Sequence, residues 1–326
     1  MLSMIMGPLI AQAIRTVAEL GVADHLASGP RSAGELAKSA DCSVSDLQRL
    51  LRVLCGLGVF RQVGTRYELT PLSEYLRRDR PDNLWAAASW FGNEMYRALG
   101  GLPLTVREGV PAWTHAIGLS YWDYLAAHPD RGLVFDTVIA TLCGDELPAI
   151  VNAYSFPHGA TVMDVGGGAG ALLAAVLREH EGLRGILFDL PGVVGRSRIG
   201  DTFRGLTARC EFEAGSFFET VPAGADLYML RHILHDWEDA SCVQILKHCA
   251  QALRADGILL VIEAMVKDAG ATSTSFVDVG MMVSLPGRER TADEYQDLFA
   301  SSGLQLMRMI RTHSAVSILE CRRACR

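Results

Sequence analysis

The stretch that decides the fold is Ala160-Thr161-Val162-Met163-Asp164-Val165-Gly166-Gly167-Gly168-Ala169-Gly170. An apolar run ends in an acid and a glycine cluster, and the helix-forming residues 171–177 follow, which predicts a strand, a tight turn and a helix. Glycine permits positive φ angles and lets the backbone approach a ligand closely. Because open α/β sheets bind ligands at the carboxyl ends of their strands, this turn is a candidate ligand site.

A second acid narrows the class of ligand. Asp189 ends the next apolar run about twenty residues after the glycines, where an acid can bind a ribose diol. A dinucleotide-binding turn has a third glycine where this chain has Ala171, and here Asp164 precedes the glycines. An acid in that place suits a ligand with a positive amino group. These residues favour S-adenosylmethionine over a nicotinamide dinucleotide, which remains the alternative.

Composition describes an ordinary globular protein. The chain has 326 residues, 49% of them hydrophobic and 21% charged, with a net charge of −7, enough for two domains. Its 8 cysteines form no C-x-x-C pair, which indicates reduced thiols rather than a disulfide framework. We find neither an apolar run long enough to span a membrane nor a signal peptide. We therefore expect a cytoplasmic protein with no membrane partner.

The first hundred residues read as three helical segments and a hairpin. Apolar residues recur at helical spacing over 8–27, Ser32 and Glu35 form a possible capping box, and Ser43 begins another helix. A β-hairpin is predicted over 59–69. This is a winged-helix pattern, and we place the domain at residues 1–105.

Two functions are open to a winged helix, DNA binding and dimerisation. Residues 1–105 contain 11 Lys and Arg against 10 Asp and Glu, without the basic excess of a DNA-binding face. The apolar first helix instead predicts a homodimer interface, so no nucleic-acid partner is expected. A helical connector over 106–155 begins the second domain, 106–326. The connector region is rich in aromatic residues, of which most would be core and a few could line a pocket for a flat aromatic ligand.

After the glycine turn, strands and helices alternate, which predicts a parallel sheet with helices on both faces. The predicted strands are 184–189, 209–213, 225–230 and 257–263, with a closing pair at 304–310 and 314–320. The predicted helices are 171–180, 191–198, 239–254 and 291–302. The expected fold is α/β and Rossmann-like, preceded by the winged-helix-like domain.

Residues 230–239, Leu-Arg-His-Ile-Leu-His-Asp-Trp-Glu-Asp, contain the highest concentration of side chains that can take part in catalysis. His235 lies just past a strand end, where it can act as a base; the alternative is a helix entry with Asp239 as N-cap. Glu263 ends the next strand and needs a partner if buried. Neighbouring strand ends lie side by side, so we expect His235 and Glu263 to meet as a base and the residue that orients it.

A metal is the other interpretation of this segment. His232, His235 and Asp236 are possible ligands, but no third ligand appears at zinc-like spacing. We therefore expect no metal.

Taken together, these motifs resemble those of the class I S-adenosylmethionine-dependent O-methyltransferases of the caffeic acid and hydroxyindole type, including their bacterial small-molecule-tailoring relatives. The resemblance covers nearly the whole chain, including the dimerisation region. It rests on residues 164–170, 188–191, 215–218, 222–226, 235–237 and 287–291.

The resemblance implies a role for each site residue. His235 would be the general base, with Glu263 and Glu289 beside its imidazole. The donor would be held by Asp164, Gly166, Gly168, Asp189, Leu190, Ser216, Phe217 and Arg231. The acceptor would be contacted by Phe135, Ile139, Asp236, Asp278, Met281 and Met282. Family members usually have Asp where this chain has Ser216 and often Met where it has Ile139.

The implied function is methylation of a hydroxyl on an aromatic secondary metabolite, with S-adenosylhomocysteine as the second product. The alternatives are an N-methyltransferase, a donor-binding member that transfers no methyl group, or a winged-helix regulator that responds to a ligand. A phenol with a pKa near 10 and a histidine near 6.5 differ by roughly 3.5 units, or about 5 kcal/mol for complete proton transfer. A carboxylate behind the imidazole narrows that difference.

Overall fold

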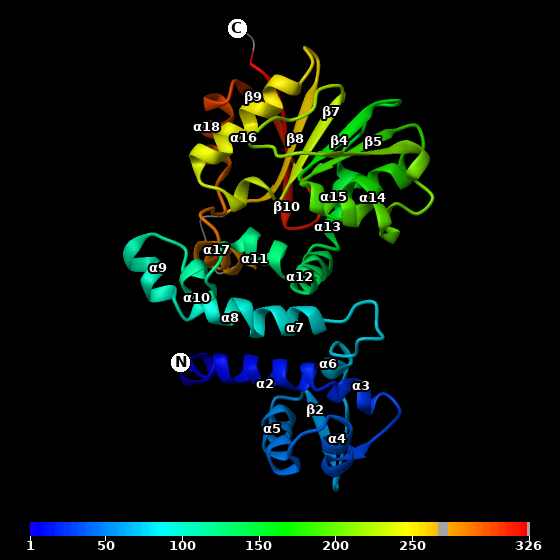
Figure 1. Ribbon diagram of the computed structural model, residues 1–326, viewed down its shortest axis with the longest axis vertical. Coiled ribbons are helices and arrows are strands. Elements are labelled where there is room, and N and C mark those ends of the chain that lie inside the picture. The colour runs from blue at the N-terminus through cyan, green and yellow to red at the C-terminus, as the bar shows by residue number, and fades with distance from the viewer. Residues whose placement is uncertain (267–272, 325–326) are drawn as a thin grey trace. The chain divides into compact units, whose positions relative to one another are not determined.

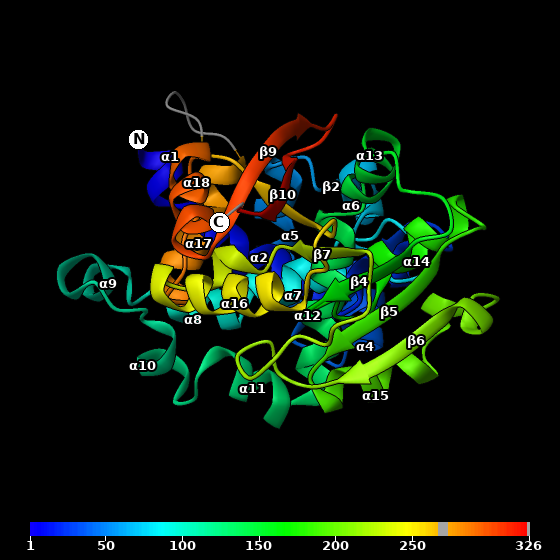
Figure 2. The ribbon, with the colours of Figure 1, turned by 90° about the horizontal axis from the view of Figure 1, so that it is seen from above.

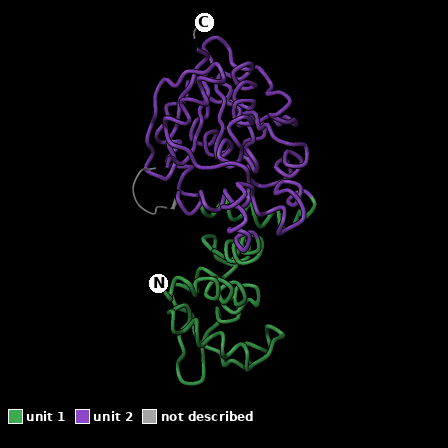
Figure 3. Tube along the Cα trace, turned by 90° about the vertical axis from the view of Figure 1, so that its left-hand side faces the viewer, with its two compact units in different colours: residues 1–97, 127–142 green, residues 98–126, 143–326 purple. Residues whose placement is uncertain are grey.

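The computed structural model describes residues 1–266 and 273–324, which form two compact units (Figure 3). One unit contains residues 1–97 and 127–142, and the other contains residues 98–126 and 143–326. Part of the segment expected as a connector thus packs with the first unit. The functional division at residue 105 stays a prediction.

The first unit is helical with a small sheet. Its elements are α1 (Leu2–Ile5), α2 (Gly7–Glu19), α3 (Val22–Leu26), β1 (Arg31–Ser32), α4 (Ala33–Ser39), α5 (Val44–Gly56), β2 (Phe60–Val63), β3 (Arg66–Leu69), α6 (Pro71–Glu74), α7 (Trp85–Gly92) and α12 (Pro129–Leu142), while α8 (Glu94–Leu99) crosses the boundary. The three strands pair in the order β1-β3-β2. The predicted hairpin is present, with Gly64 at a φ of 59° between its strands.

The predicted helix caps of this unit are also present. The Ser32 side chain accepts the backbone N–H of Glu35, whose carboxylate accepts the N–H of Ser32. Ser43 caps α5 with a single hydrogen bond, in which its side chain accepts the backbone N–H of Asp46. Gly21, with a φ of 62°, separates α2 from α3, and the apolar pattern of residues 8–27 is interrupted at this glycine. Each feature follows from local hydrogen bonding or a positive φ angle.

The second unit contains the large sheet (Figure 1). Its helices are α9 (Leu102–Glu108), α10 (Trp113–Ile117), α11 (Tyr121–Ala127), α13 (Glu146–Ala153), α14 (Ala171–Glu179), α15 (Pro191–Ile199), α16 (Asp239–Ala252), α17 (Ser273–Ser284) and α18 (Ala292–Ser301), with 3-10 turns η1 (Asp201–Phe203), η2 (Thr207–Arg209) and η3 (Leu234–Asp236). Its strands are β4 (Thr161–Val165), β5 (Arg184–Asp189), β6 (Cys210–Ala214), β7 (Leu227–Arg231), β8 (Ile258–Ala264), β9 (Leu304–Arg311) and β10 (Val316–Arg323).

The seven strands lie in the order β6-β5-β4-β7-β8-β10-β9, and Figure 2 shows β4, β5 and β6 side by side. The five strands from β6 to β8 are parallel, whereas β10 pairs antiparallel with both β8 and β9. The closing strand pair is therefore confirmed, but the last strand inserts between its predecessor and the parallel strands. As a result the carboxyl ends of β4, β7 and β8, which carry the predicted site, are interior to the sheet.

Both faces of the sheet are covered, as predicted. Met163 and Val165 face a core shared with α16 and α18, while Val162 faces a second core shared with α13 and α14. Successive strand residues point to opposite faces, so one short strand contributes to both cores. This explains why β4 is apolar nearly throughout. No helix among the described residues is long and apolar enough to cross a membrane.

Two elements differ from the sequence prediction. Helix α17 was not predicted, and Asp239 is not an N-cap. The cap of α16 is Glu238, which makes no capping hydrogen bond through its side chain. Asp239 instead accepts hydrogen bonds from the guanidinium of Arg290 at 2.8 and 3.0 Å. Arg290, about fifty positions along the chain, binds the Asp239 carboxylate, because a charged donor forms stronger hydrogen bonds with a carboxylate than neutral backbone N–H groups do.

The segment before α18 passes unusually close to η3. A Cβ atom on Gly287 would lie 2.0 Å from the carbonyl oxygen of His235 and 2.4 Å from the backbone nitrogen of Trp237. Both atoms are backbone, so they cannot rotate away. Glycine is therefore required where these two segments meet.

We expect Gly287→Ala to lower the free energy of unfolding by about 2 kcal/mol or more, because overpacking displaces backbone. Gly34→Ala is the matched control, since Gly34 lies within α4 and a methyl group added there would meet nothing within 4 Å, and alanine favours helix. Urea unfolding of both variants measures the difference. Equal stabilities would show that the two segments separate at little cost.

Candidate active site

The glycine turn leaves its backbone bare at the end of β4. Gly166 and Gly168 have φ angles of 70° and 57°. The N–H of Gly166 donates to the carbonyl of Phe188 at 2.8 Å. A Cβ on Gly166 would lie 2.6 Å from Ile233 and 3.3 Å from the ring of Phe217. The turn thus packs against residues from two other segments of the predicted site, and only glycine fits there.

Asp189 joins the turn to the end of β5. Its Oδ2 accepts the N–H of Gly168 at 2.8 Å, and its Oδ1 accepts the N–H of Leu190 at 2.6 Å. Burial raises the pKa of Asp189, and these two N–H groups oppose the rise. The carboxylate therefore fixes the relative positions of two loops, and each oxygen keeps a second lone pair for a ligand hydroxyl.

Asp164 is buried beneath the turn, with 2% of its surface exposed. Burial raises its pKa to about 7, with Arg231 opposing the rise and Asp189 adding to it. A positive ligand beside this group would favour its ionised form. Arg231, at the end of β7, forms an ion pair at 3.2 Å with Glu146 of α13.

Ser216 and Phe217 follow β6. The hydroxyl of Ser216 accepts the N–H of Phe218 at 3.2 Å, and the carbonyl of Phe217 accepts a hydrogen bond from His248 at 2.8 Å. Phe217 lies beside the glycine turn, as described above. Contact of Ser216 with an adenine stays a prediction.

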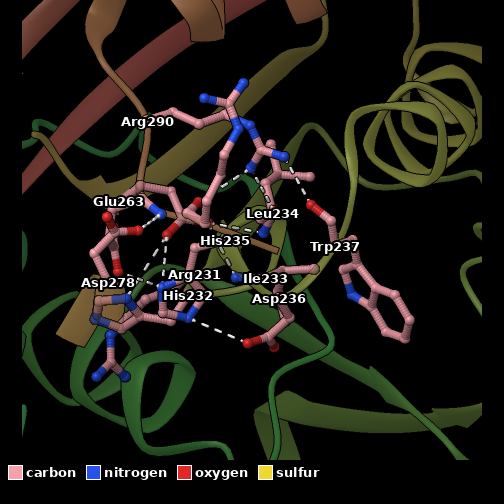
Figure 4. Close-up of polar contacts among 12 residues, drawn as sticks. Arg231, His232, Ile233, Leu234, His235, Asp236, Trp237, Glu263, Asp278 and Arg290 are labelled. Atoms are coloured by element: carbon pink, nitrogen blue, oxygen red, sulfur yellow. Dashed lines mark hydrogen bonds and ion pairs between the residues drawn. The ribbon is translucent and has the colours of Figure 1, made fainter. Parts of the chain in front are cut away.

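His235 lies in η3, and three carboxylates surround its imidazole (Figure 4). Nδ1 is 2.8 Å from Glu289 Oε1 and 3.9 Å from Glu263 Oε2, and Nε2 is 3.4 Å from Asp236 Oδ1. Burial lowers the pKa of His235, but Glu263, Asp236 and Glu289 outweigh it and raise the pKa to about 9. Because a carboxylate oxygen accepts, Nδ1 carries the proton that it donates to Glu289.

Glu263 does meet His235, but its closest contacts are with backbone. This carboxylate is fully buried, and its Oε1 accepts the N–H groups of Ile233 and Leu234 at 3.1 and 2.8 Å. Its Oε2 has no hydrogen-bond partner. Glu263 therefore shapes the turn that carries His235, while Glu289 makes the direct hydrogen bond to the ring. The structure thus gives Glu289 the orienting contact that we had expected from Glu263.

Two further residues hold this arrangement. Asp278 of α17 accepts the backbone N–H of Glu289 at 2.9 Å. Arg290 is fully buried and donates to the carbonyls of Leu234 and Trp237 at 2.8 and 2.7 Å. Asp278, expected at the acceptor, thus positions Glu289. Arg290 is within the motif quoted above, but no local pattern indicates that it reaches back to η3.

The remaining predicted acceptor residues are dispersed. Met281 and Met282 are partly buried on α17, and Asp236 is buried, where loss of solvation raises its pKa to about 7. Phe135 and Ile139 lie on α12 in the first unit. The Phe135 ring packs against the Trp90 ring there, with the ring centroids 5.3 Å apart. Their contact with an acceptor stays a prediction.

The sequence did not single out Glu146. Its Oε2 is 2.8 Å from His232 Nε2 as well as near Arg231. Two groups of side chains have ligand atoms close enough to share a metal ion: Cys143, Glu146 and His232, and His232, His235 and Glu263. The third ligand that the sequence lacked is thus present in space, although Glu146 is already paired with two cations. The expected lack of a metal requirement stays a prediction.

The residues at the glycine turn fit S-adenosylmethionine. Bare backbone at Gly168 admits a close ligand, and two acids, the buried Asp164 and the partly buried Asp189, suit one with a net positive charge. Gly168 has open space where a side chain would be. A pyrophosphate would be repelled by Asp164 in its ionised form, which argues against the dinucleotide alternative.

Comparison with known proteins gives matches along nearly the whole chain. A model of the O-methyltransferase domain matches residues 100–305, and one of the O-methyltransferase dimerisation domain matches residues 2–79. Phenazine O-methyltransferase PhzM of Lysobacter antibioticus is 38% identical over 99% of this chain and 95% of that protein. The mitomycin biosynthesis 6-O-methyltransferase of Streptomyces lavendulae is 38% identical over 96% of this chain and 91% of that protein.

A solved structure gives the same result. The O-methyltransferase NcsB1 from neocarzinostatin biosynthesis, in complex with S-adenosylmethionine and 2-hydroxy-5-methyl naphthoic acid, matches with a TM-score of 0.87 and 35% identity over 96% of each chain. Since models of both domains match and relatives with 38% identity cover nearly the whole chain, this chain belongs to the S-adenosylmethionine-dependent O-methyltransferases.

Proposed function

We propose that this enzyme methylates a hydroxyl of an aromatic small molecule, with His235 as the general base. The observation that carries the proposal is the hydrogen bond from His235 Nδ1 to the buried carboxylate of Glu289 at 2.8 Å. When the imidazole is neutral, that bond leaves the lone pair on Nε2. Nε2 is then the atom that takes the proton of the acceptor hydroxyl.

S-adenosylmethionine supplies a methyl group that is already activated by its sulfonium. The protein must therefore hold the acceptor oxygen in line with it and remove a proton. We assign donor binding to the glycine turn and the acids beside it, together with Leu190, Ser216, Phe217 and Arg231. Bare backbone, buried acids and the nearness of Phe217 to Gly166 support this assignment.

The carboxylates make His235 a stronger base. With its pKa raised to about 9, the difference from a phenol near 10 is roughly one unit, or about 1.4 kcal/mol. The consequence is that the imidazole holds a proton at neutral pH and must lose it before it can accept another. An acceptor with an unusually acidic hydroxyl reduces the demand on the base further.

Glu289 and Glu263 have different roles. Glu289 orients the ring and stabilises the imidazolium through a direct hydrogen bond. Glu263 holds the backbone of η3 and acts on the ring only at 3.9 Å. Removing the Glu289 charge therefore affects proton transfer more than removing the Glu263 charge, provided that the amide oxygen in Glu263→Gln still accepts the two backbone N–H groups.

We infer an aromatic acceptor because the relatives named above act on phenazine and mitomycin compounds or bind a naphthoic acid. Met281 and Met282, which are partly buried, offer flexible apolar contacts to a flat ring. We assign further acceptor contacts to Asp236, Phe135 and Ile139. Asp278 would act indirectly, through Glu289.

We further propose that the protein is a cytoplasmic homodimer. The match to a dimerisation domain supports the dimer, as do the large apolar residues exposed at the start of the chain, where Leu2, Met4 and Ile5 are 73%, 80% and 64% exposed. Exposed apolar surface of this kind marks an interface. Seven free cysteines among the described residues are consistent with a reducing compartment.

His235→Ala should lower the turnover number by roughly 10²- to 10⁴-fold, which leaves almost no activity. The donor dissociation constant measured by calorimetry should stay nearly unchanged. His313→Ala, at an exposed position between β9 and β10, is the matched control and should be fully active. Glu289→Gln should reduce turnover less than His235→Ala, and Glu263→Gln less again. A loss in Glu263→Gln as large as that in His235→Ala would point to another base.

The rate should rise with pH. Neutral imidazole is the active form and its pKa is about 9, so kcat/KM measured at subsaturating donor should increase about tenfold per pH unit below that value and level off above it. Glu289→Gln removes a negative charge and should move the rise to lower pH. A profile that is flat from pH 6.5 to 8.5 would contradict the protonation state that we assign to His235.

Sedimentation should show a dimer at micromolar concentration. A paired substitution of two exposed residues of the first helix, Met4→Ser with Ile5→Ser, should weaken the dimer, because burial of their side chains contributes to association. Leu142→Ser, at an exposed apolar position of the first unit outside this helix, is the control. A wild-type protein that sediments as a monomer would refute the proposal.

A further inference from the structure

His232 has no role in the function proposed above, yet its backbone is strained. It follows β7 with a φ of 52°, and it is one of two non-glycine residues with positive φ among those the structure describes. This conformation costs energy for a residue with a Cβ and persists where the surroundings enforce it. Its N–H donates to the carbonyl of Ile262 at 3.1 Å, which fixes the backbone to β8.

The His232 side chain is held by a buried acid. Nε2 is 2.8 Å from Oε2 of Glu146, which is 9% exposed and also pairs with Arg231. The thiol of Cys143 belongs to the same cluster, with its sulfur within 4.8 Å of these ligand atoms. Burial lowers the pKa of His232, but Cys143, Glu146 and Glu263 beside its ring raise it well above the usual value. The contact with the Glu146 carboxylate therefore favours the protonated, positively charged form of His232.

This cation lies against the ring of His235. The two ring centroids are 5.1 Å apart and the planes are inclined by 30° (Figure 4). Both Nδ1 atoms are near the same oxygen, Glu263 Oε2, at 3.7 Å for His232 and 3.9 Å for His235. The nearby arginines are turned to other partners: Arg231 pairs with Glu146, and Arg290 with backbone carbonyls and Asp239.

The carboxylates around His235 make its proton harder to release, and the charge of His232 opposes this effect. Glu289, Asp236 and Glu263 all favour the imidazolium, whereas a base must return to its neutral form after each turnover. In the reaction the acceptor oxygen gains the methyl group and its proton passes to Nε2, and that proton must then leave for water. A neighbouring positive charge favours its release.

We propose that His232 is a positioning residue for methyl transfer: a cation held by Glu146 against the face of the His235 imidazole, where it offsets the surrounding carboxylates. This inference rests on the proposed function, since it assumes that His235 is the base. The strain at His232 is then explained, because the left-handed turn is what places one imidazole over the other. A purely structural ion pair would affect stability but not the proton affinity of His235.

The test is His232→Asn. Asparagine tolerates the left-handed conformation and carries no charge. Titration of His235 by NMR, with ring-labelled histidine and the signal assigned by its loss in His235→Ala, should show its pKa about one unit higher than in the wild type. The acid side of the pH–rate profile should move up equally, so that kcat/KM at pH 7 falls about tenfold while the high-pH plateau stays within about twofold.

Glu146→Gln provides an independent variant that leaves the His232 backbone unchanged. Without its counter-ion His232 holds its proton less strongly, so the pKa of His232 should fall in this variant, and the pKa of His235 should rise where His232 has become neutral. His232→Lys restores the charge and should bring the pH–rate profile back toward that of the wild type. These variants keep the test decisive if His232→Asn does not fold.

The two measurements separate two failures. An unchanged pKa of His235 in folded His232→Asn and Glu146→Gln would overturn this inference and leave His235 as the base. A raised pKa with an unchanged pH–rate profile would show that His232 acts on His235 as stated but that His235 is not the base.

Discussion

The site depends on one buried carboxylate, Glu263 at the end of β8. A carboxylate removed from water is stable only if its oxygens receive hydrogen bonds or face positive charge. The donors here are the N–H groups of Ile233 and Leu234, so the chain leaving β7 must turn sharply enough to present both. That turn is η3, and it places His235 at the carboxyl ends of the interior strands.

The same turn is held from its other side. Arg290 binds the carbonyls of Leu234 and Trp237, and Gly287 allows backbone to touch backbone. The arginine directly follows Glu289 in sequence, so the segment that clamps η3 also delivers the carboxylate that orients the imidazole. Geometry of the base and stability of the turn are therefore coupled, because both come from residues 287–290.

The charged groups around His235 have opposing effects on its pKa. In the proposed mechanism, the carboxylates that raise the pKa of His235 favour proton transfer from the acceptor but hinder recovery of the neutral imidazole. The stacked imidazolium of His232 acts in the opposite direction. At the proposed donor site, burial raises the pKa of Asp164 and Asp189, and a cationic ligand beside these acids would favour their ionised forms.

The sequence by itself determined what depends on neighbouring residues. Alternation of strands and helices, the glycine turn, the Ser32 and Ser43 caps and the position of His235 after a strand all follow from local hydrogen bonds, periodicity and φ angles. The nearness of His235 and Glu263 followed too, because adjacent parallel strands bring their ends together. Only the tertiary structure decided that Glu289 contacts the His235 ring and that Glu146 contacts His232. It also decided that Asp239 binds Arg290 instead of capping α16, and that β10 pairs with β8. These partners are separated by tens of residues, and a charged side chain pairs with whichever counter-charge folding brings nearest, a choice that no local pattern contains.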